Sequence, residues 1–291
     1  MIEGGADMKQ TGTAELRKGH KNRYKIAVHV VLIFGVLVTV VPFLWMILTS
    51  FKTLGESMMI PPAILPKSFQ PVNYASALSM LPFGIFFYNT AVSTIVIVAG
   101  QIFLCSMAGY AFARIDFPCK NALFLIVLSV LMVPSQIFLL PQYLIIQKLG
   151  LLNTVNALWI PNIFSAFGTF LLRQFFATLP KDLEEAATLD GCGQGRIFWQ
   201  IMLPLARPGI VSLAIFTGLF AWNNLMWPLI VNTSTSKMTL SVGLATLEGA
   251  HFTDYPVLMA GSVMAIWPML VVFIIFQKQF VQGIALTGTK A

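Results

Sequence analysis

The chain alternates long apolar runs with short polar connectors. A helix of about 20 apolar residues crosses the hydrocarbon core of a bilayer, since each residue adds about 1.5 Å. Helices satisfy their own backbone hydrogen bonds in lipid, whereas the alternating segments of about 10 residues that a membrane β-barrel requires are absent. The pattern therefore predicts an all-α membrane protein with six transmembrane helices, at residues 26–51, 87–112, 121–145, 154–176, 209–231 and 257–280.

Composition supports the same class of protein. Hydrophobic residues make up 57% of the 291 residues and charged residues only 10%, against about 25% charged residues in soluble domains. The net charge of +7 is spread over connectors rather than over a polar domain, so we expect contact with membrane lipid and not with nucleic acid. The first run is too long for a signal-peptide core and lacks a cleavage site, which predicts an uncleaved anchor.

The basic residues predict an orientation. If each run crosses the membrane once, 14 of the 18 lysines and arginines fall on one side, which the positive-inside rule assigns to the cytoplasm. Both termini and the segment 179–208 are then cytoplasmic, and the connectors 52–86 and 232–256 face outward. The cytoplasmic set is Lys9, Arg17, Lys18, Lys21, Arg23, Lys25, Arg114, Lys120, Arg173, Lys181, Arg196, Arg207, Lys278 and Lys290, and the outer set is Lys52, Lys67, Lys148 and Lys237.

The predicted helices hold no acidic or basic residue away from their ends. This argues against a proton-driven carrier, because ionisable groups at membrane depth mark proton relays. The helices do hold amides, tryptophans and prolines, and bent helices of that kind suit a path for an uncharged, hydroxyl-rich solute better than an ion filter. We expect path residues at Gln136, Trp222, Asn223 and Asn224. The two asparagines would point about 100° apart on one helix, Trp222 could instead anchor the helix at the membrane interface, and the prolines could serve packing alone.

No resident cofactor or catalytic group is predicted. Cys105, Cys119 and Cys192 form no CxxC pair and show no ligand spacing with His20, His29 or His251. The chain has no GxxxxGK[ST] phosphate loop, so it cannot hydrolyse ATP by that route. HExxH, GxSxG and in-helix carboxylate pairs are absent as well, so we expect no catalytic residues.

One polar segment, residues 179–208, interrupts the apolar chain. Asp182 followed by Glu185 predicts a helix that begins with a capping box. Gly191 should end this helix in a left-handed conformation, and "RIFWQIML" should begin a second helix before Pro204. Small alanines would let another surface approach closely, and the acidic side chains offer charge-assisted hydrogen bonds to a basic partner. A solvated hairpin with no partner is the alternative.

A resemblance rests on this segment. Glu185-Ala186-Ala187, Asp190-Gly191 and, after nine residues, Ile201-Met202-Leu203-Pro204 match the pattern E-A-A-x-x-D-G…I-x-L-P. The pattern resembles the EAA loop of permease subunits of binding-protein-dependent ABC importers. Further stretches such as "SMAGYAFARIDF", "PQYLIIQKLGLLNT" and "WNNLMWPLIV" resemble the carbohydrate-uptake branch, of MalG type. The chain departs from that branch at Asn224, where an acidic residue is frequent, and at its ending "TGTKA".

The resemblance implies a type I importer permease fold of MetI-like kind and a machine of several chains. A MalF-like second permease would complete the path, two cytoplasmic ABC ATPases would bind ATP and Mg, and an extracytoplasmic solute-binding protein would deliver the sugar, an oligosaccharide by expectation, across a bacterial inner membrane. The loop would couple to the ATPases through Glu184, Glu185, Ala186, Ala187, Asp190, Gly191, Ile201, Leu203 and Pro204.

The implied organisation divides the chain into five parts. These are a cytoplasmic tail (1–25), a first transmembrane helix (26–51), an external loop (52–86), a permease core (87–282) with the coupling loop 179–208, and a cytoplasmic tail (283–291). Contacts with the binding protein are expected at Leu244, Ala245 and Thr246. The alternative function is a secondary carrier or channel that acts alone on a small polar solute.

Overall fold

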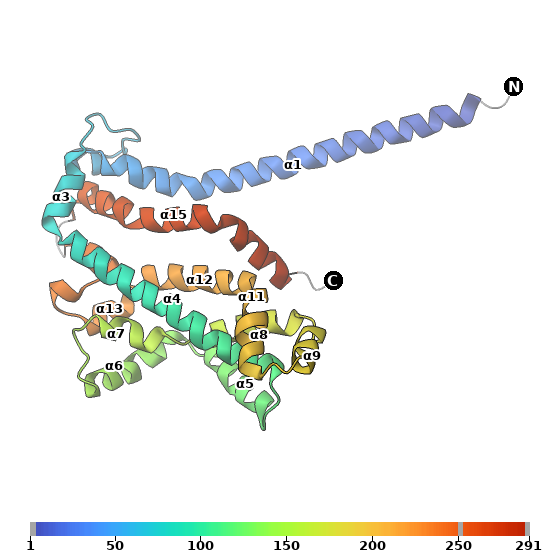
Figure 1. The fold of residues 1–291 in the computed structure, drawn as a ribbon. Coiled ribbons are helices and arrows are strands. Elements are labelled where there is room, and N and C mark those ends of the chain that lie inside the picture. The colour runs from blue at the N-terminus through green and yellow to red at the C-terminus, as the bar shows by residue number, and fades with distance from the viewer. Residues whose placement is uncertain (1–3, 250–252, 289–291) are drawn as a thin grey trace. The chain divides into compact units, whose positions relative to one another are not determined.

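The computed structural model describes residues 4–249 and 253–288, and this part of the chain is helical (Figure 1). An isolated bridge between Glu248 and Thr253 is the only β pairing among these residues. The all-α prediction is therefore confirmed. The elements are α1 (Gly4–Ser50), α2 (Leu54–Ser57), α3 (Val72–Met80), α4 (Phe83–Arg114), α5 (Lys120–Ser129), η1 (Val130–Met132), η2 (Ser135–Phe138), α6 (Leu139–Lys148), α7 (Asn156–Trp159), η3 (Ile160–Asn162), α8 (Ala166–Thr178), α9 (Asp182–Leu189), α10 (Gln194–Ile197), η4 (Phe198–Met202), α11 (Leu203–Leu205), α12 (Arg207–Trp222), α13 (Met226–Val231), η5 (Thr235–Lys237), α14 (Leu240–Ala245) and α15 (Tyr255–Gly288).

Three helices among the described residues are long and apolar enough to cross a membrane: Val28–Ser50, Phe83–Arg114 and Tyr255–Gln277. Two further pairs meet the same criterion only when each pair is taken as one bent span. Lys120–Met132 and Ser135–Lys148 meet at 101°, and Gln194–Leu205 and Arg207–Trp222 meet at 74°. The structure thus holds three to five candidate spans by this measure, and the count of six stays a prediction.

The broken spans have local causes. Pro134 separates η1 from η2, and proline removes a backbone donor that a continuous helix would use. The predicted run 154–176 is divided into α7, η3 and α8, and Ser165 caps α8 by accepting a hydrogen bond from the Gly168 amide at 3.2 Å. The run 121–145 therefore becomes four helical segments and the run 154–176 becomes three.

The chain forms two compact units, and residues up to 73 with 255–260 form the first. Here α1 extends back to Gly4, so helical backbone continues into the predicted N-terminal tail. Thr53 and Glu56 form a complete capping box at α2. Lys52 is buried, with its ammonium 4.1 Å from the centre of the Trp45 ring. Burial lowers the pKa of Lys52 below its usual value, and the charge of Glu56 opposes this shift.

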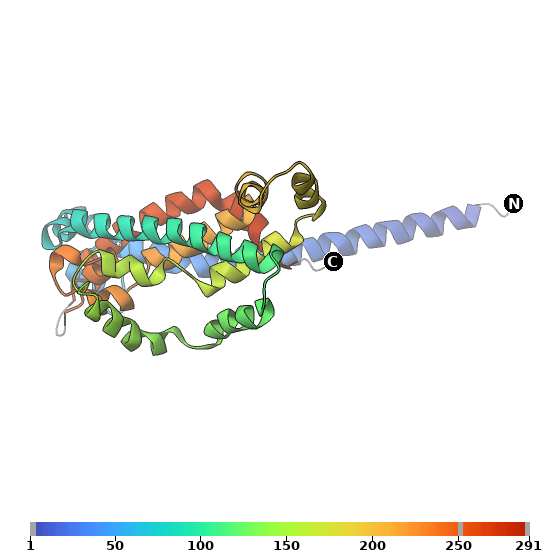
Figure 2. The same ribbon diagram turned by 60° about the horizontal axis from the view of Figure 1, so that its bottom comes forward.

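Residues 74–254 and 261–291 form the second unit, whose central element is α4. Helices α8 and α12 pack along α4 (Figure 1). In both views α9 lies near the C-terminal end of α4, whereas α13 lies near its other end (Figure 2). Helix α15 continues to Gly288, and the last three residues of the predicted C-terminal tail, together with His251, lie outside the described residues.

Candidate functional site

Helix α9 forms the first half of the polar segment, but without the predicted capping box. The helix begins at Asp182, and Lys181 before it already has helical dihedrals, with φ −70° and ψ −30°. A side chain accepts from the first turn when the N-cap backbone is extended, and no such bond is present here. The capping-box prediction was therefore wrong. The acids of the first turn, Asp182, Glu184 and Glu185, still place negative charge at the positive end of the helix dipole.

The C-terminus of α9 confirms the prediction made for Gly191. Its φ is +81°, in the left-handed region. The Gly191 amide donates to the Thr188 carbonyl at 3.0 Å, and the Cys192 amide donates to the Ala187 carbonyl at 2.9 Å. This pair of bonds is a Schellman motif, which satisfies the last carbonyls of the helix and reverses the chain.

The second half of the segment is helical, as predicted, but its centre is a π-helix. Helix α10 leads into η4, where the Leu203 amide donates to the Phe198 carbonyl five residues back. Pro204 follows immediately and lies in the short α11. Since proline cannot donate to the preceding turn, an irregular helical turn at this point is expected, and π turns are frequent at functional sites.

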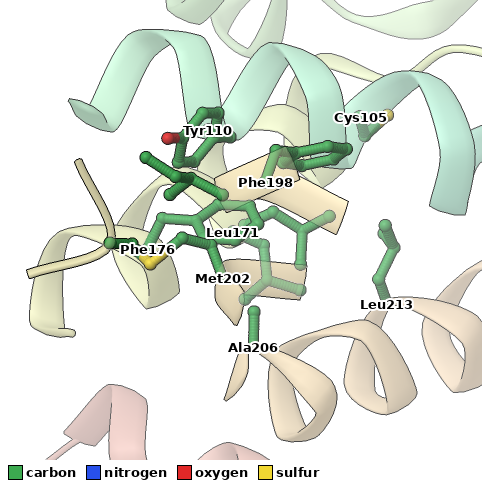
Figure 3. Close-up of a cluster of buried hydrophobic side chains, with 11 residues drawn as sticks. Cys105, Tyr110, Leu171, Phe176, Phe198, Met202, Ala206 and Leu213 are labelled. Carbon is green, nitrogen blue, oxygen red and sulfur yellow. The ribbon is translucent and has the colours of Figure 1, made fainter. Parts of the chain in front are cut away.

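A buried apolar cluster holds the two halves together (Figure 3). Ala187 of α9 is 6% exposed, and Ile201 and Leu203 pack partly buried against the same cluster. Residues 179–208, called the coupling segment below after their predicted role, are therefore part of the folded core and not a loose loop. The buried members of the cluster are Cys105, Tyr110, Leu171, Leu172, Phe176, Ala187, Ile197, Phe198, Met202, Ala206 and Leu213.

The other predicted coupling residues face outward. Glu185, Ala186, Asp190, Gly191 and Pro204 are exposed. Leu189 lies between them in the chain and is 89% exposed, which leaves an apolar side chain beside the acids. The segment thus has a buried side, with Ala187, and an open side that combines carboxylates with apolar groups.

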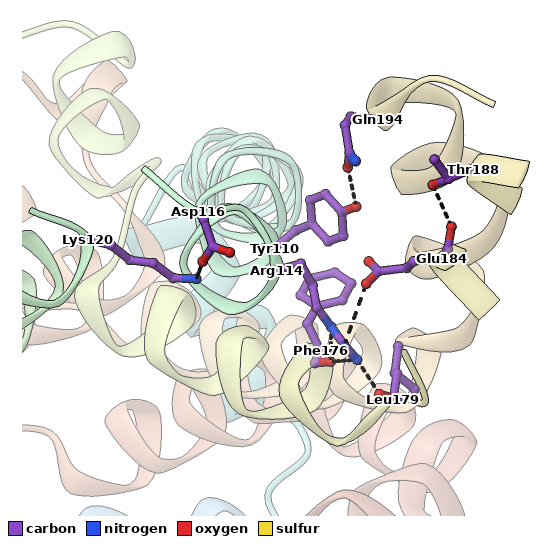
Figure 4. Close-up of polar contacts among 9 residues, drawn as sticks. All are labelled: Tyr110, Arg114, Asp116, Lys120, Phe176, Leu179, Glu184, Thr188 and Gln194. Atoms are coloured by element: carbon purple, nitrogen blue, oxygen red, sulfur yellow. Dashed lines mark hydrogen bonds and ion pairs between the residues drawn. The ribbon is translucent and has the colours of Figure 1, made fainter. Parts of the chain in front are cut away.

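Glu184 differs from Glu185 because it points to the body of the second unit (Figure 4). Its carboxylate lies 3.6 Å from the Arg114 guanidinium at the end of α4, and the Arg114 side chain is only 5% exposed. Tyr110, one turn earlier on α4, donates a hydrogen bond to Gln194 at 3.1 Å. Sequence reasoning missed these α4 residues: Arg114 was used only as an orienting charge, although it lies within the quoted stretch "SMAGYAFARIDF".

The tryptophans of α12 and α13 are buried within the second unit. Trp222 is 8% exposed, and its indole nitrogen donates to the Ala265 carbonyl at 3.0 Å. Trp227 is 4% exposed and donates to the Ala157 carbonyl at 2.8 Å. Each indole is thus satisfied by a neighbouring helix, which gives both residues a packing function. Trp222 also lines a groove of about 520 Å³, between α4, α12 and α15, whose walls are almost wholly apolar.

The predicted path amides lie where helices break. Asn223 and Asn224 follow the last residue of α12, so the expectation that they point about 100° apart on one helix was wrong. Asn223 is exposed, and Asn224 accepts a hydrogen bond from the Trp227 amide at 3.4 Å. Gln136 is exposed in η2, just after the break at Pro134. The helices that follow these breaks, α6 and α13, contribute to one apolar cluster.

The predicted binding-protein contacts belong to α14 and its end. Leu244 packs against the apolar cluster that contains Trp222 and Leu240, and Ala245 is half-buried. Thr246 is exposed and donates to the Gly243 carbonyl at 2.6 Å. Only Thr246 of the three presents a freely accessible side chain.

Known proteins resemble most of the chain. AraQ of Halalkalibacterium halodurans, an arabinooligosaccharides transport system permease protein, is 39% identical, over 88% of this chain and 93% of that one. NgcG of Streptomyces coelicolor, a diacetylchitobiose uptake system permease protein, is 33% identical, over 90% and 88%. UgpE of Yersinia enterocolitica, an sn-glycerol-3-phosphate transport system permease protein, is 30% identical, over 88% and 94%.

A solved structure shares the fold. It is described as the crystal structure of a bacterial ABC transporter involved in the import of the acidic polysaccharide alginate. One of its chains superposes with a TM-score of 0.78 at 23% identity, over 90% of this chain and 98% of that one. The predicted importer permease fold is thereby confirmed. Residues 101–286, which include the coupling segment, match the family described as binding-protein-dependent transport system inner membrane component. The chain belongs to this family, the multi-pass inner-membrane permeases of ABC importers.

Proposed function

We propose that this chain is the MalG-type permease subunit of an ATP-driven importer of neutral oligosaccharides. A MalF-like permease would form the path with it, two cytoplasmic ATPases would bind ATP and Mg, and an external binding protein would deliver the sugar. Two of the three relatives above carry oligosaccharide names. The residues proposed for the path, Gln136, Asn223 and Asn224, are uncharged amides, which suits a neutral sugar better than an anion such as glycerol phosphate.

Helix breaks support the location proposed for the path. Backbone that is not helical is tolerated at membrane depth where it lines a cavity, and transporters use such breaks for substrate contact. The proposed path amides lie at such breaks, after Pro134 and after the end of α12. Trp222 makes a weaker candidate, because its indole nitrogen is already bonded and its groove is apolar.

The observation that carries the proposal is the two-sided coupling segment. Its inner side belongs to a buried cluster, so the segment can transmit force, and its outer side leaves Glu185, Ala186 and Leu189 accessible. An exposed leucine beside carboxylates suits a groove that has both an apolar floor and basic residues. ATPase closure would move this helix and rock the attached spans between inward-open and outward-open states.

The test is uptake into liposomes of labelled arabinotriose, diacetylchitobiose and glycerol 3-phosphate. We expect uptake of a neutral oligosaccharide only when the companion permease, the ATPases, the binding protein and ATP are all present. Uptake by the single chain without ATP would instead establish a carrier that acts alone.

A charge reversal tests the coupling segment in the same assay. Glu185→Lys should leave the chain in the membrane, because the side chain is exposed, yet abolish most ATP-dependent uptake. Asp116→Lys is the matched control, an exposed acid outside the coupling segment, and should transport as the unmodified chain does. Normal uptake by Glu185→Lys would remove residue 185 from the ATPase contact.

A further inference from the structure

The last turn of α4 makes an unusually complete set of bonds to the coupling segment (Figure 4). The Arg114 guanidinium donates to the Phe176 carbonyl from Nε at 3.0 Å and from Nη2 at 2.6 Å. It also donates to the Leu179 carbonyl, and its third nitrogen faces Glu184 at 3.6 Å. These acceptors lie at the end of α8 and on α9. One planar side chain therefore caps α8 and pairs with α9, which we call the coupling helix. The fixed, forked geometry of the arginine guanidinium suits this combination.

Tyr110 adds a hydrogen bond to the chain that follows the coupling helix. Its hydroxyl donates to Gln194 Oε1 at 3.1 Å, and Gln194 is the first residue of α10. Its ring packs edge-on against Phe176 at 5.5 Å and lies 5.1 Å from the ring of Phe198. Tyr110 and Arg114 are four residues apart and thus share a helix face. This face of α4 therefore contacts Leu179 before α9, Glu184 on α9 and Gln194 after α9.

The opposite end of α4 is bonded to the connector before α14. Asn89 is 3% exposed, and its amide nitrogen donates to the carbonyls of Ser236 at 3.0 Å and Met238 at 2.9 Å. The hydroxyl of Thr90 accepts from the Leu240 amide at 2.9 Å. α4 therefore has buried polar attachments near both ends, and between them it is one unbroken helix.

We propose that Arg114 and Tyr110 are positioning residues that make α4 move with the coupling helix, so that α4 links the ATPase contact to the segment before α14. This inference rests on the proposed function. Along the chain α9 follows α8 and leads into α10, whereas α4 has no direct covalent connection to α9. A shift of α9 against α4 would separate the buried Arg114 guanidinium from the Glu184 carboxylate, its ion-pair partner. Removing the partner of a buried charge is strongly unfavourable. Rigid elements joined by such bonded contacts carry coupling between distant sites.

The experiment is a double-mutant cycle on the complete transporter in liposomes. Glu184→Gln keeps the shape of the side chain and removes its charge. Arg114→Gln removes the guanidinium group that makes the bonds. The measured quantity is the solute imported per ATP hydrolysed, at equal yield of assembled complex. We expect each single variant to lower this ratio about three- to tenfold. The double variant should fall no further than Arg114→Gln alone, since both changes break the same link.

Asp116 and Lys120 supply the matched control. They form an exposed ion pair at 3.4 Å, just beyond the end of α4. Asp116→Asn and Lys120→Gln should leave the ratio unchanged, since exposed pairs contribute little. Tyr110→Phe is the second variant. It keeps the ring in the cluster, removes the hydroxyl that bonds Gln194 and interacts with Glu184, and should lower the ratio in the same direction.

The outcomes separate the two proposals. If the unmodified complex imports sugar with ATP and Glu184→Gln has an unchanged ratio, the link through Arg114 is wrong and the proposed function stands. The link is also refuted if the double variant loses as much of the ratio as the two single variants combined. If the unmodified complex imports no solute with ATP, the proposed function fails and this inference fails with it.

Discussion

Gly191 ends the coupling helix in a conformation that other residues adopt only at a cost. A Cβ at this position would meet no atom within 4 Å, so the cost of Gly191→Ala is conformational and amounts to about 1–2 kcal/mol. We expect faster hydrogen–deuterium exchange of the amides in α9, because its Schellman bonds weaken. Gly195→Ala is the matched control: Gly195 has equal space, lies in α10 and has no positive φ, so exchange should stay the same or slow. Equal exchange in both variants would contradict the strain at Gly191.

At the scale of single residues, the sequence predicts features whose causes lie within a few neighbouring residues. The glycine that ends α9 and the return to helix before Pro204 both lie within one short stretch. The capping box failed because it depends on the dihedrals of Lys181, which the residue types do not fix. Arg114 and Tyr110 escaped notice because their partners lie 62 to 84 residues away. The signal that the sequence does offer is an arginine at the end of a long apolar run.

Close packing of α4 against α8 is the contact on which the second unit is built. A Cβ on Gly109 would lie 2.9 Å from the Arg173 amide nitrogen and 3.0 Å from the Leu172 Cβ. Backbone atoms cannot move aside as a side-chain end can, so Gly109→Ala should destabilise the packing by about 1–3 kcal/mol. We expect a lower midpoint of thermal unfolding for the complex in detergent.

Gly218→Ala is the matched control for this contact. Gly218 lies in α12, and its added Cβ would meet only Val98, at 3.9 Å. The midpoint should stay the same or rise, since alanine favours a helix by up to about 1 kcal/mol over glycine. A similar midpoint for the two variants would show that α4 and α8 can separate without loss.

At the scale of elements, the sequence predicts those helices that coincide with long apolar runs. Each of the six runs is helical along most of its length, because helices are what a lipid-facing chain can form. The bends and breaks were less accessible to prediction. Proline marks positions where a helix can bend, as at Pro134, but the sequence does not say whether it bends slightly or by 101°. That outcome depends on packing of the following helix, and α6 packs with α7 and α13 through contacts distant in sequence.

Helix α4 is long enough to connect the two ends of the second unit across a membrane. Asn89 and Arg114 are 25 positions apart on one helix, which corresponds to roughly 37 Å. This exceeds the roughly 30 Å hydrocarbon core. The coupling segment at Arg114 and the connector held by Asn89 must therefore lie on opposite sides if α4 crosses the bilayer. The distribution of basic residues predicts that the Arg114 end is the cytoplasmic one.

Thiol labelling tests this orientation with a native residue. Cys119 is exposed, just beyond the end of α4, and should react with a membrane-impermeant maleimide only in inside-out vesicles. A chain that keeps Cys119 and has Cys105→Ser and Cys192→Ser gives the cleanest signal. The matched control replaces all three cysteines by serine and adds Lys67→Cys, an exposed position in the proposed external loop. It should react only in right-side-out vesicles. The reverse pattern would place the coupling segment outside, beyond the reach of any cytoplasmic ATPase.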